Sequence, residues 1–172
     1  MLTNLRLPAA LLAVALVALG CGSDDSLGPG AQPLFRPAVH LPQGSATTSR
    51  VDPELRLAFI GAKEDARTDG VTLVVNSGWR SRAHQQRLFD EAVQRYGSED
   101  EARRYVATPD GSAHVTGDAL DIGPPEGAAW LGEHGAAYGL CQVFANEAWH
   151  FELATSPGGT CPEMLPDSSY RG

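Results

Sequence analysis

Residues 112–121 read Ser-Ala-His-Val-Thr-Gly-Asp-Ala-Leu-Asp, and residues 147–150 read Glu-Ala-Trp-His. The first stretch holds His114 and Asp121, with Gly117 between them to permit a tight turn or a close backbone approach. The second holds His150, with Glu147 three residues before it. Two imidazoles and one carboxylate can hold a metal and leave a position open for water, whose proton a separate carboxylate accepts. We therefore interpret His114, Asp121 and His150 as metal ligands, with Glu147 as the candidate base.

The local pattern places these residues and leaves one choice open. We expect His114 at the end of a loop, Asp121 on the strand that follows, and Glu147 in or near a connection between two strands. Glu152 is a second candidate for the base, because residues two apart in a regular strand share a face and it would lie beside His150. The spacing alone does not choose between Glu147 and Glu152. Two nitrogens and one oxygen suit Zn²⁺ best, although other divalent ions are compatible with the set.

The flanking sequence predicts an α+β fold with a small antiparallel sheet and helices packed on it, because helices come first and most strands are grouped later. Strands are expected over residues 71–75, 119–122, 140–144 and 149–153, the last two as a pair. Helices are expected from Asp52-Pro53 to before Gly70, and over residues 81–96, 98–106 and 127–138. The expected apolar faces of the first two helices are Leu55, Leu57, Ala58, Ile60 and Ala62, and then Leu88, Phe89, Ala92, Val93 and Tyr96.

Composition limits the partners. The chain has 172 residues and a formal net charge of −8, with its basic residues scattered among acids. That length suits one domain with a real core. An acidic chain without a basic cluster is a poor candidate for binding nucleic acid or anionic lipid. We expect a monomer.

The N-terminus indicates export. Arg6 precedes an apolar run over residues 11–19, which has the length of a signal-peptide core and is short for a membrane span. The run ends at Gly20-Cys21, which resembles a bacterial lipoprotein signal in which the cysteine is lipidated. An ordinary secretory signal with an incidental cysteine is the alternative. Residues 1–21 are therefore interpreted as a signal with lipidation at Cys21, and residues 22–50 as a tether and irregular lead-in.

The other two cysteines, Cys141 and Cys161, flank the segment that contains Glu147 and His150. In an exported protein such a pair suggests a disulfide, which would brace one side of the metal site. Metal ligation by the thiols is the alternative, but the spacing lacks a close cysteine pair. We assign residues 51–155 to the metal-binding domain and residues 156–172 to a tail tied by this disulfide.

Three motifs, Ser77-Gly-Trp-Arg-Ser81, Ser112-x-His-x-x-Gly-x-Ala-x-Asp121 and Glu147-x-Trp-His150, closely resemble the VanY-type D-alanyl-D-alanine carboxypeptidases. These are zinc peptidases of the DD-peptidase/hedgehog-like fold. The resemblance spans about residues 50–155, with the motifs in the same order. It departs at Trp79, where tyrosine is frequent, and at Ala148, where proline is common.

The resemblance implies specific roles. It makes His114, Asp121 and His150 the zinc ligands and Glu147 the catalytic base in place of Glu152. Arg80 would hold the scissile carbonyl or the oxyanion, although a structural salt bridge to a nearby acid is its alternative role. Ser112 and Gln85 stand where the family places polar residues that contact substrate.

The implied function is removal of terminal D-alanine from peptidoglycan stem peptides that end in D-Ala-D-Ala, at the outer face of a bacterial membrane. An endopeptidase or D,D-dipeptidase acting on cell-wall peptides is an alternative, because related folds do each of these. A non-catalytic zinc-binding recognition module is another, but such a module has no need to keep Glu147 and Arg80 together. A serine peptidase fits poorly, because no Ser-x-x-Lys motif supplies an activated nucleophile.

Overall fold

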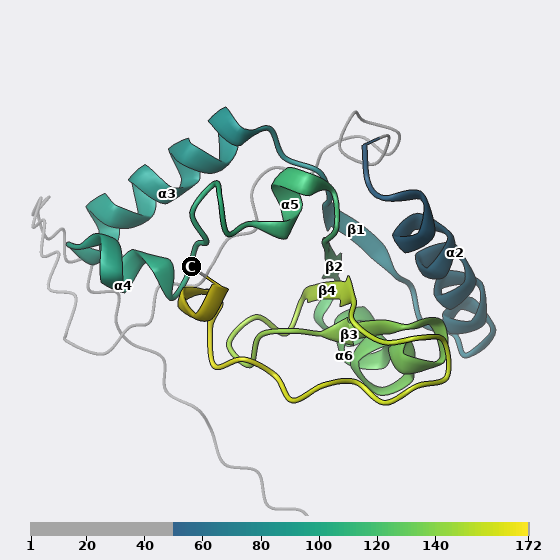
Figure 1. The fold of residues 1–172 in the computed structure, drawn as a ribbon. Coiled ribbons are helices and arrows are strands. Elements are labelled where there is room, and N and C mark those ends of the chain that lie inside the picture. The colour runs from purple at the N-terminus through teal and green to yellow at the C-terminus, as the bar shows by residue number, and fades with distance from the viewer. Residues whose placement is uncertain (1–49, 172) are drawn as a thin grey trace, which may run out of the picture. The chain divides into compact units, whose positions relative to one another are not determined.

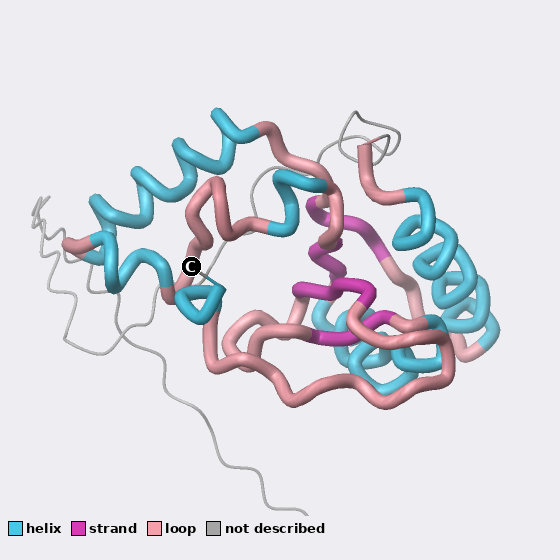
Figure 2. The backbone as a smooth tube through the Cα atoms, in the orientation of Figure 1, coloured by secondary structure: helices cyan, strands magenta, loops and turns pink. Residues whose placement is uncertain are grey.

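The computed structural model describes residues 50–171. The expected signal, Cys21 and almost all of the expected tether therefore lie outside the described residues. The predicted α+β class is confirmed (Figures 1 and 2). In chain order the elements are α2 (Pro53–Thr68), β1 (Val74–Ser77), α3 (Arg82–Tyr96), α4 (Glu99–Arg103), α5 (Ala113–Thr116), β2 (Leu120–Gly123), α6 (Pro125–His134), η1 (Gly135–Tyr138), β3 (Leu140–Gln142), β4 (His150–Leu153) and η2 (Ser168–Arg171).

Within residues 50–171 the strands form one four-stranded antiparallel sheet in the order β1-β2-β4-β3. The expected pair of late strands is confirmed, with Leu140 opposite Leu153. Strand β1 covers residues 74–77, whereas the sequence predicted a strand over residues 71–75. Pairing with β2 begins only at Val74. The central pairing of β2 with β4 sets Asp121 opposite His150. Side chains alternate along a strand, so Leu120, Ile122 and Phe151 enter the core while Asp121 and His150 point to the other face.

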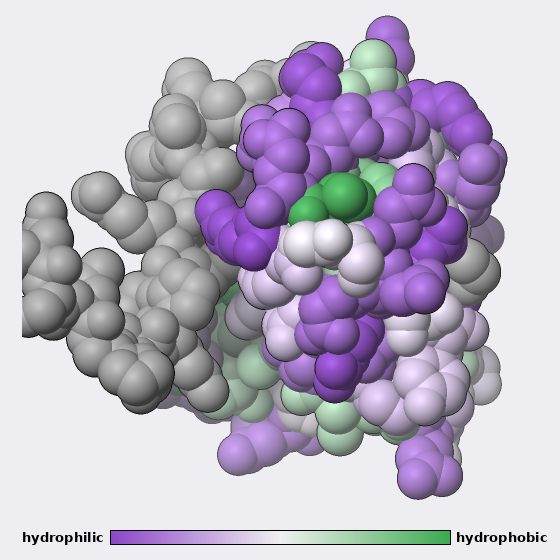
Figure 3. Space-filling model, turned by 90° about the vertical axis from the view of Figure 1, so that its left-hand side faces the viewer, coloured by the Kyte–Doolittle hydropathy of each residue, from purple (hydrophilic) through white to green (hydrophobic). Residues whose placement is uncertain are grey.

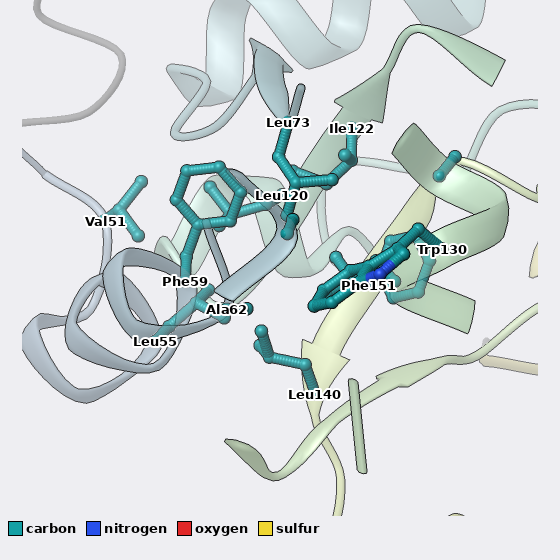
Figure 4. Packing of buried hydrophobic residues seen from close by; sticks show 13 residues of the cluster. Val51, Leu55, Phe59, Ala62, Leu73, Leu120, Ile122, Trp130, Leu140 and Phe151 are labelled. Carbon is teal, nitrogen blue, oxygen red and sulfur yellow. The ribbon is translucent and has the colours of Figure 1, made fainter. Parts of the chain in front are cut away.

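The main core lies between this sheet and helices α2 and α6 (Figure 4). Helix α2 begins as predicted, with the Asp52 carboxylate accepting bonds from the Glu54 and Leu55 amides. Its predicted apolar face is partly wrong, since Leu57 is 65% exposed and Ile60 55% exposed. The helix instead buries a stripe that returns at helical spacing, namely Leu55, Phe59, Ala62 and Ala66. Further members of the core come from the sheet and α6, namely Leu73, Leu120, Ile122, Trp130, Leu131, Leu140 and Phe151.

Helices α3 and α4 form a second, smaller cluster. Ser81 caps α3, and Gly97 ends it in the left-handed conformation, as predicted. Phe89 and Ala92 pack with Ala102 of α4, but Leu88 is only half-buried. Helix α4 ends at Arg103, shorter than expected. The face drawn in Figure 3 is mostly hydrophilic, with a small apolar area. Among the described residues no helix is both long and apolar enough to cross a membrane.

The last predicted helix divides into α6 and the 3-10 turn η1, which ends at Gly139. A disulfide joins Cys141 to Cys161, so the predicted pairing is confirmed and thiol ligation of a metal is excluded. The segment beyond it is more than a tail. Leu165 pairs with Phe144, and the Ser168 hydroxyl donates to the Arg103 carbonyl at 2.6 Å. The C-terminal end therefore lies beside α4 (Figure 1).

Candidate metal centre

Three separate elements bring the predicted ligands together. His114 comes from α5, Asp121 from β2 and His150 from β4, and all three are buried. One ligand atom from each lies within 4.8 Å of the other two. The sequence therefore grouped them correctly, but His114 lies on a one-turn helix and not at the end of a loop.

Backbone contacts fix the position of His114. Its Nδ1 lies 2.7 Å from the Gly78 carbonyl oxygen, which can only accept, so Nδ1 carries the proton. That tautomer leaves the Nε2 lone pair facing Asp121, 3.2 Å from Oδ1. Burial is the largest influence on this imidazole and lowers its pKa, which favours the neutral form that a metal requires.

The chain approaches itself closely at Gly117, just after α5. Its φ is +94°, and a Cβ at this position would lie 2.3 Å from the Arg50 carbonyl oxygen. The Asp52 amide also donates to the Gly117 carbonyl at 2.9 Å. The tight turn and the close backbone approach that the sequence suggested for Gly117 are therefore both present. They hold the turn between His114 and Asp121.

His150 presents its other nitrogen to the centre. Its Nε2 lies 2.8 Å from Glu152 Oε1, while Nδ1 lies 3.4 Å from Asp121 Oδ1. Burial opposes the charge on the ring, but hydrogen bonds to Asp121 and Glu152 outweigh it and raise the pKa of His150 to about 9. An Nε2–H donated to Glu152 leaves Nδ1 free as a ligand, the usual arrangement of a carboxylate behind a metal-binding histidine.

This geometry separates the two candidate bases. Glu152 lies on the same face of β4 as His150, as expected, but it bonds the nitrogen that points away from Asp121. Its carboxylate also accepts from Arg171 at 2.6 and 2.8 Å. Although burial opposes the shift, these hydrogen bonds keep the pKa of Glu152 below its usual value. Glu152 is thus a hydrogen-bond partner of His150, on the side of the ring away from the other predicted ligands.

Glu147 lies in the β3–β4 connection, as expected. Its Oε2 is 3.8 Å from His150 Nδ1, on the side of the ring that faces the other ligands. Its backbone carbonyl accepts from the His150 amide at 3.1 Å, which ties the two residues into one turn. Burial raises the pKa of Glu147 to about 7. A carboxyl that titrates near neutrality can exchange a proton at little cost in either direction.

Arg80 binds the far side of the Asp121 carboxylate. Its Nη2 donates to Asp121 Oδ2 at 2.5 Å and its Nε to the Ser77 hydroxyl at 2.9 Å. Burial raises the pKa of Asp121, but His114, His150 and, to a smaller extent, Arg80 outweigh it and keep that pKa well below its usual range. The salt bridge to an acid considered in the sequence is therefore present, and that acid is itself a predicted ligand. The guanidinium side chain remains 20% exposed.

Both predicted substrate contacts, Gln85 and Ser112, are buried. Gln85 is 1% exposed, donates to the Ala107 carbonyl at 2.9 Å and accepts from Arg80 Nη1 at 3.4 Å. Both functional groups of its amide are thus used inside the protein. Ser112 stands at the start of α5, but its hydroxyl does not cap the helix.

Sequence reasoning missed two residues that contact the predicted centre. Arg171 approaches the centre from η2, and the Phe144 ring lies 5.1 Å from the His150 ring. No local spacing signals these contacts. An arginine in a stretch of Pro, Gly and Ser looks like an ordinary surface charge until the chain folds back.

The donor set fits zinc. It offers two imidazole nitrogens and one carboxylate oxygen, and each group is held from behind by Gly78, Glu152 or Arg80. Such partners fix the tautomer and orientation of a ligand before the metal arrives. Three protein ligands with a further position free is the arrangement of catalytic zinc sites.

Comparison with known proteins also supports a zinc site. Residues 48–159 match the family model described as VanY, D-alanyl-D-alanine carboxypeptidase. A D-alanyl-D-alanine carboxypeptidase of Enterococcus faecalis is 30% identical over 64% of this chain, which spans about half (49%) of that relative's length. Two solved structures each match at 28% identity and a TM-score of 0.56 over 59% of this chain. One is the vancomycin-resistance D,D-pentapeptidase VanY in complex with Zn(II), 71% of which is covered, and the other is VanYB in complex with D-alanine-D-alanine, 70% of which is covered.

Proposed function

Because the chain belongs to the VanY family of D-alanyl-D-alanine carboxypeptidases, we propose that it is a zinc-dependent carboxypeptidase. Its substrates are peptidoglycan stem peptides, from which it removes the terminal D-alanine. One observation carries the proposal: a partly buried carboxyl group, Glu147, whose side chain is 13% exposed, stands 3.8 Å from His150 Nδ1 in the three-residue metal centre. A site that only bound a metal would need no such group.

The reaction is hydrolysis of one peptide bond. His114, Asp121 and His150 would hold the zinc ion, which would lower the pKa of water and supply positive charge to the reaction. Glu147 takes one proton from water as the oxygen adds to the carbonyl carbon. It then gives that proton to the departing amine as the carbon–nitrogen bond breaks. A pKa near 7 suits both halves of this exchange.

Arg80 supplies a fixed positive charge next to Asp121. Its bonds to Asp121 and Ser77 hold the guanidinium in place before substrate arrives. We assign it to the oxyanion that develops on the carbonyl, because preorganised donors are most effective where charge appears in the transition state. Ser112 contacts the peptide in this scheme, whereas Gln85 acts by holding Arg80.

Two relatives support the proposed substrate. The VanYB structure holds D-alanine-D-alanine, and the Enterococcus relative carries the name of that activity. An endopeptidase, a D,D-dipeptidase and an L,D-carboxypeptidase are alternative outcomes of the experiment below, since all would use the same metal and base.

We also propose that the protein is exported and held at the outer face of a bacterial membrane by lipid on Cys21. The apolar run before that cysteine supports this, and the Cys141–Cys161 disulfide suits an oxidising compartment. Replacement of Cys21 by serine should release the protein from the membrane fraction and abolish labelling by a fatty-acid analogue. A Cys21→Ser protein that is still labelled and membrane-bound would exclude this anchor.

We propose further that the protein acts as a monomer, which analytical ultracentrifugation can test.

The activity is tested on a stem pentapeptide ending in D-Ala-D-Ala, with products read by mass spectrometry. We expect loss of one alanine, abolished by a chelator and restored by zinc. The same peptide ending in L-alanine should remain intact. Internal cleavage would make the protein an endopeptidase. Bound stoichiometric zinc with no product from any stem peptide would favour a recognition module.

A further inference from the structure

The C-terminal segment, residues 160–171, lies beyond the part of the chain that matches the family model, which ends at 159. It is nevertheless attached to the domain at successive points. Cys161 is bonded to Cys141, and the Leu165 amide donates to the Val143 carbonyl at 2.9 Å. Figure 1 shows this segment, in yellow, running from the region of β3 to a position near α4. Because of these attachments, the last described residues of the segment lie next to the metal centre.

Arg171 is the residue that arrives there. Its Nη1 donates to both oxygens of Glu152, at 2.6 and 2.8 Å. Its guanidinium carbon also lies 5.1 Å from the centroid of the Phe144 ring. Both groups in turn contact His150, since Glu152 bonds its Nε2 and the Phe144 ring lies beside it. Arg171 therefore contacts two residues, Glu152 and Phe144, that both contact His150.

We propose that Arg171 is a positioning residue for the metal centre: it holds Glu152, which holds His150 with Nδ1 facing the metal position. The inference rests on the proposed function only in needing His114, Asp121 and His150 to bind a metal. It adds to the centre a residue from the C-terminal segment.

Burial and charge explain why this support matters. The side chain of Glu152 is 11% exposed, so its carboxylate has little water to bond. A buried carboxylate is stable only where charged or hydrogen-bonding partners surround it. Arg171 supplies that charge while leaving the oxygens free to accept from His150. Without it, Glu152 gains by turning toward solvent, and His150 loses the acceptor that fixes its tautomer and ring angle.

The test measures zinc affinity of the full chain by competition with a chromogenic chelator, a readout independent of catalysis. We expect Arg171→Met to bind zinc about 10- to 100-fold more weakly, the usual cost of losing a partner behind a metal ligand. Arg171→Lys, which keeps the charge but loses the paired geometry, should fall between that variant and the wild type. Tyr170→Ala is the matched control, because that neighbouring side chain is 65% exposed, and it should bind zinc as the wild type does.

A double-mutant cycle separates positioning from general support of the fold. If Arg171 acts through Glu152, then Arg171→Met should change the affinity less than about twofold in a Glu152→Gln background. Substitution by cobalt gives a second readout, since a displaced ligand alters the visible absorption bands of the bound ion. Thermal unfolding of each metal-free variant reports stability separately.

Several results would overturn the inference. Wild-type zinc affinity in Arg171→Met would do so, as would an equal loss with and without Glu152. A lowered melting temperature with unchanged affinity would make Arg171 a structural residue only. If Arg171→Met does not fold, Arg171→Lys decides, and wild-type affinity there counts against the proposal. Zinc binding without peptidase activity would remove the proposed function and leave this comparison intact, whereas absence of zinc binding in the wild type would remove both.

Discussion

Zinc binding should release a proton, and its affinity should rise with pH. In the metal-free protein Asp121 and Glu152 raise the pKa of His150 to about 9, so near neutral pH this ring carries two protons. Its Nδ1 must lose one before it can bind a metal. His114 behaves differently, because burial lowers its pKa and it is already neutral at that pH. His150 should therefore release one proton for each zinc bound.

The magnitude follows from the distance between the pKa and the working pH. At pH 7 a pKa of about 9 is two units away. Displacing that proton weakens the observed binding by about 2.7 kcal/mol, or about 100-fold. Affinity should rise about tenfold from pH 7 to pH 8 and level off near the pKa of His150. Below pH 7 the dependence should steepen, because Glu147, with a pKa of about 7, then also holds a proton beside the metal.

Calorimetry can measure this directly. Titrations with zinc at pH 7.5, in two non-coordinating buffers with different ionisation enthalpies, give the number of protons released. Glu152→Gln is the control, because it removes the negative charge behind His150 and so weakens one of the two hydrogen bonds that raise the pKa of His150. That variant should release fewer protons than the wild type at the same pH of 7.5. Affinity that does not change between pH 7 and pH 8, with no proton released, would refute the protonated state assigned to His150.

Three further outcomes are expected. Glu147→Gln should bind zinc but lose about 10²- to 10⁴-fold in kcat on the stem pentapeptide, and wild-type turnover would show that another group is the base. Gly117→Ala should lower the free energy of unfolding by about 2 kcal/mol or more, because φ is +94° and a carbonyl oxygen occupies the space of the Cβ. Gly132→Ala has open space and should cost nothing in the same urea titration, so equal effects at the two glycines would contradict the reasoning. Replacing Cys141 and Cys161 together by serine should cost about 3 kcal/mol, from closure of a loop with a sequence separation of 20. Unchanged urea stability of that double variant would argue against this loop-closure account.

The limits of sequence reasoning are clearest in helix α2. Leu57 and Ile60 are as apolar as the residues that enter the core, and they recur at helical spacing on another side of the helix. Both stripes satisfy the pattern, so the pattern cannot choose between them. The choice is made by docking on the sheet and α6, where Leu55 and Phe59 find partners and Leu57 does not.

The sequence by itself determined the chemistry of the centre. The ability to bind a metal depends on residue type, and a short motif shows it. The caps of α3 and the turn at Gly117 depend on residues that are close in sequence, so short motifs predict them as well. Only the tertiary structure decided how that chemistry is supported. It turned Gln85 inward, where its amide bonds Arg80 and the Ala107 carbonyl, and it brought Arg171 from the C-terminal segment to Glu152. Such contacts depend on where distant segments meet when the chain folds, and no local pattern carries that information.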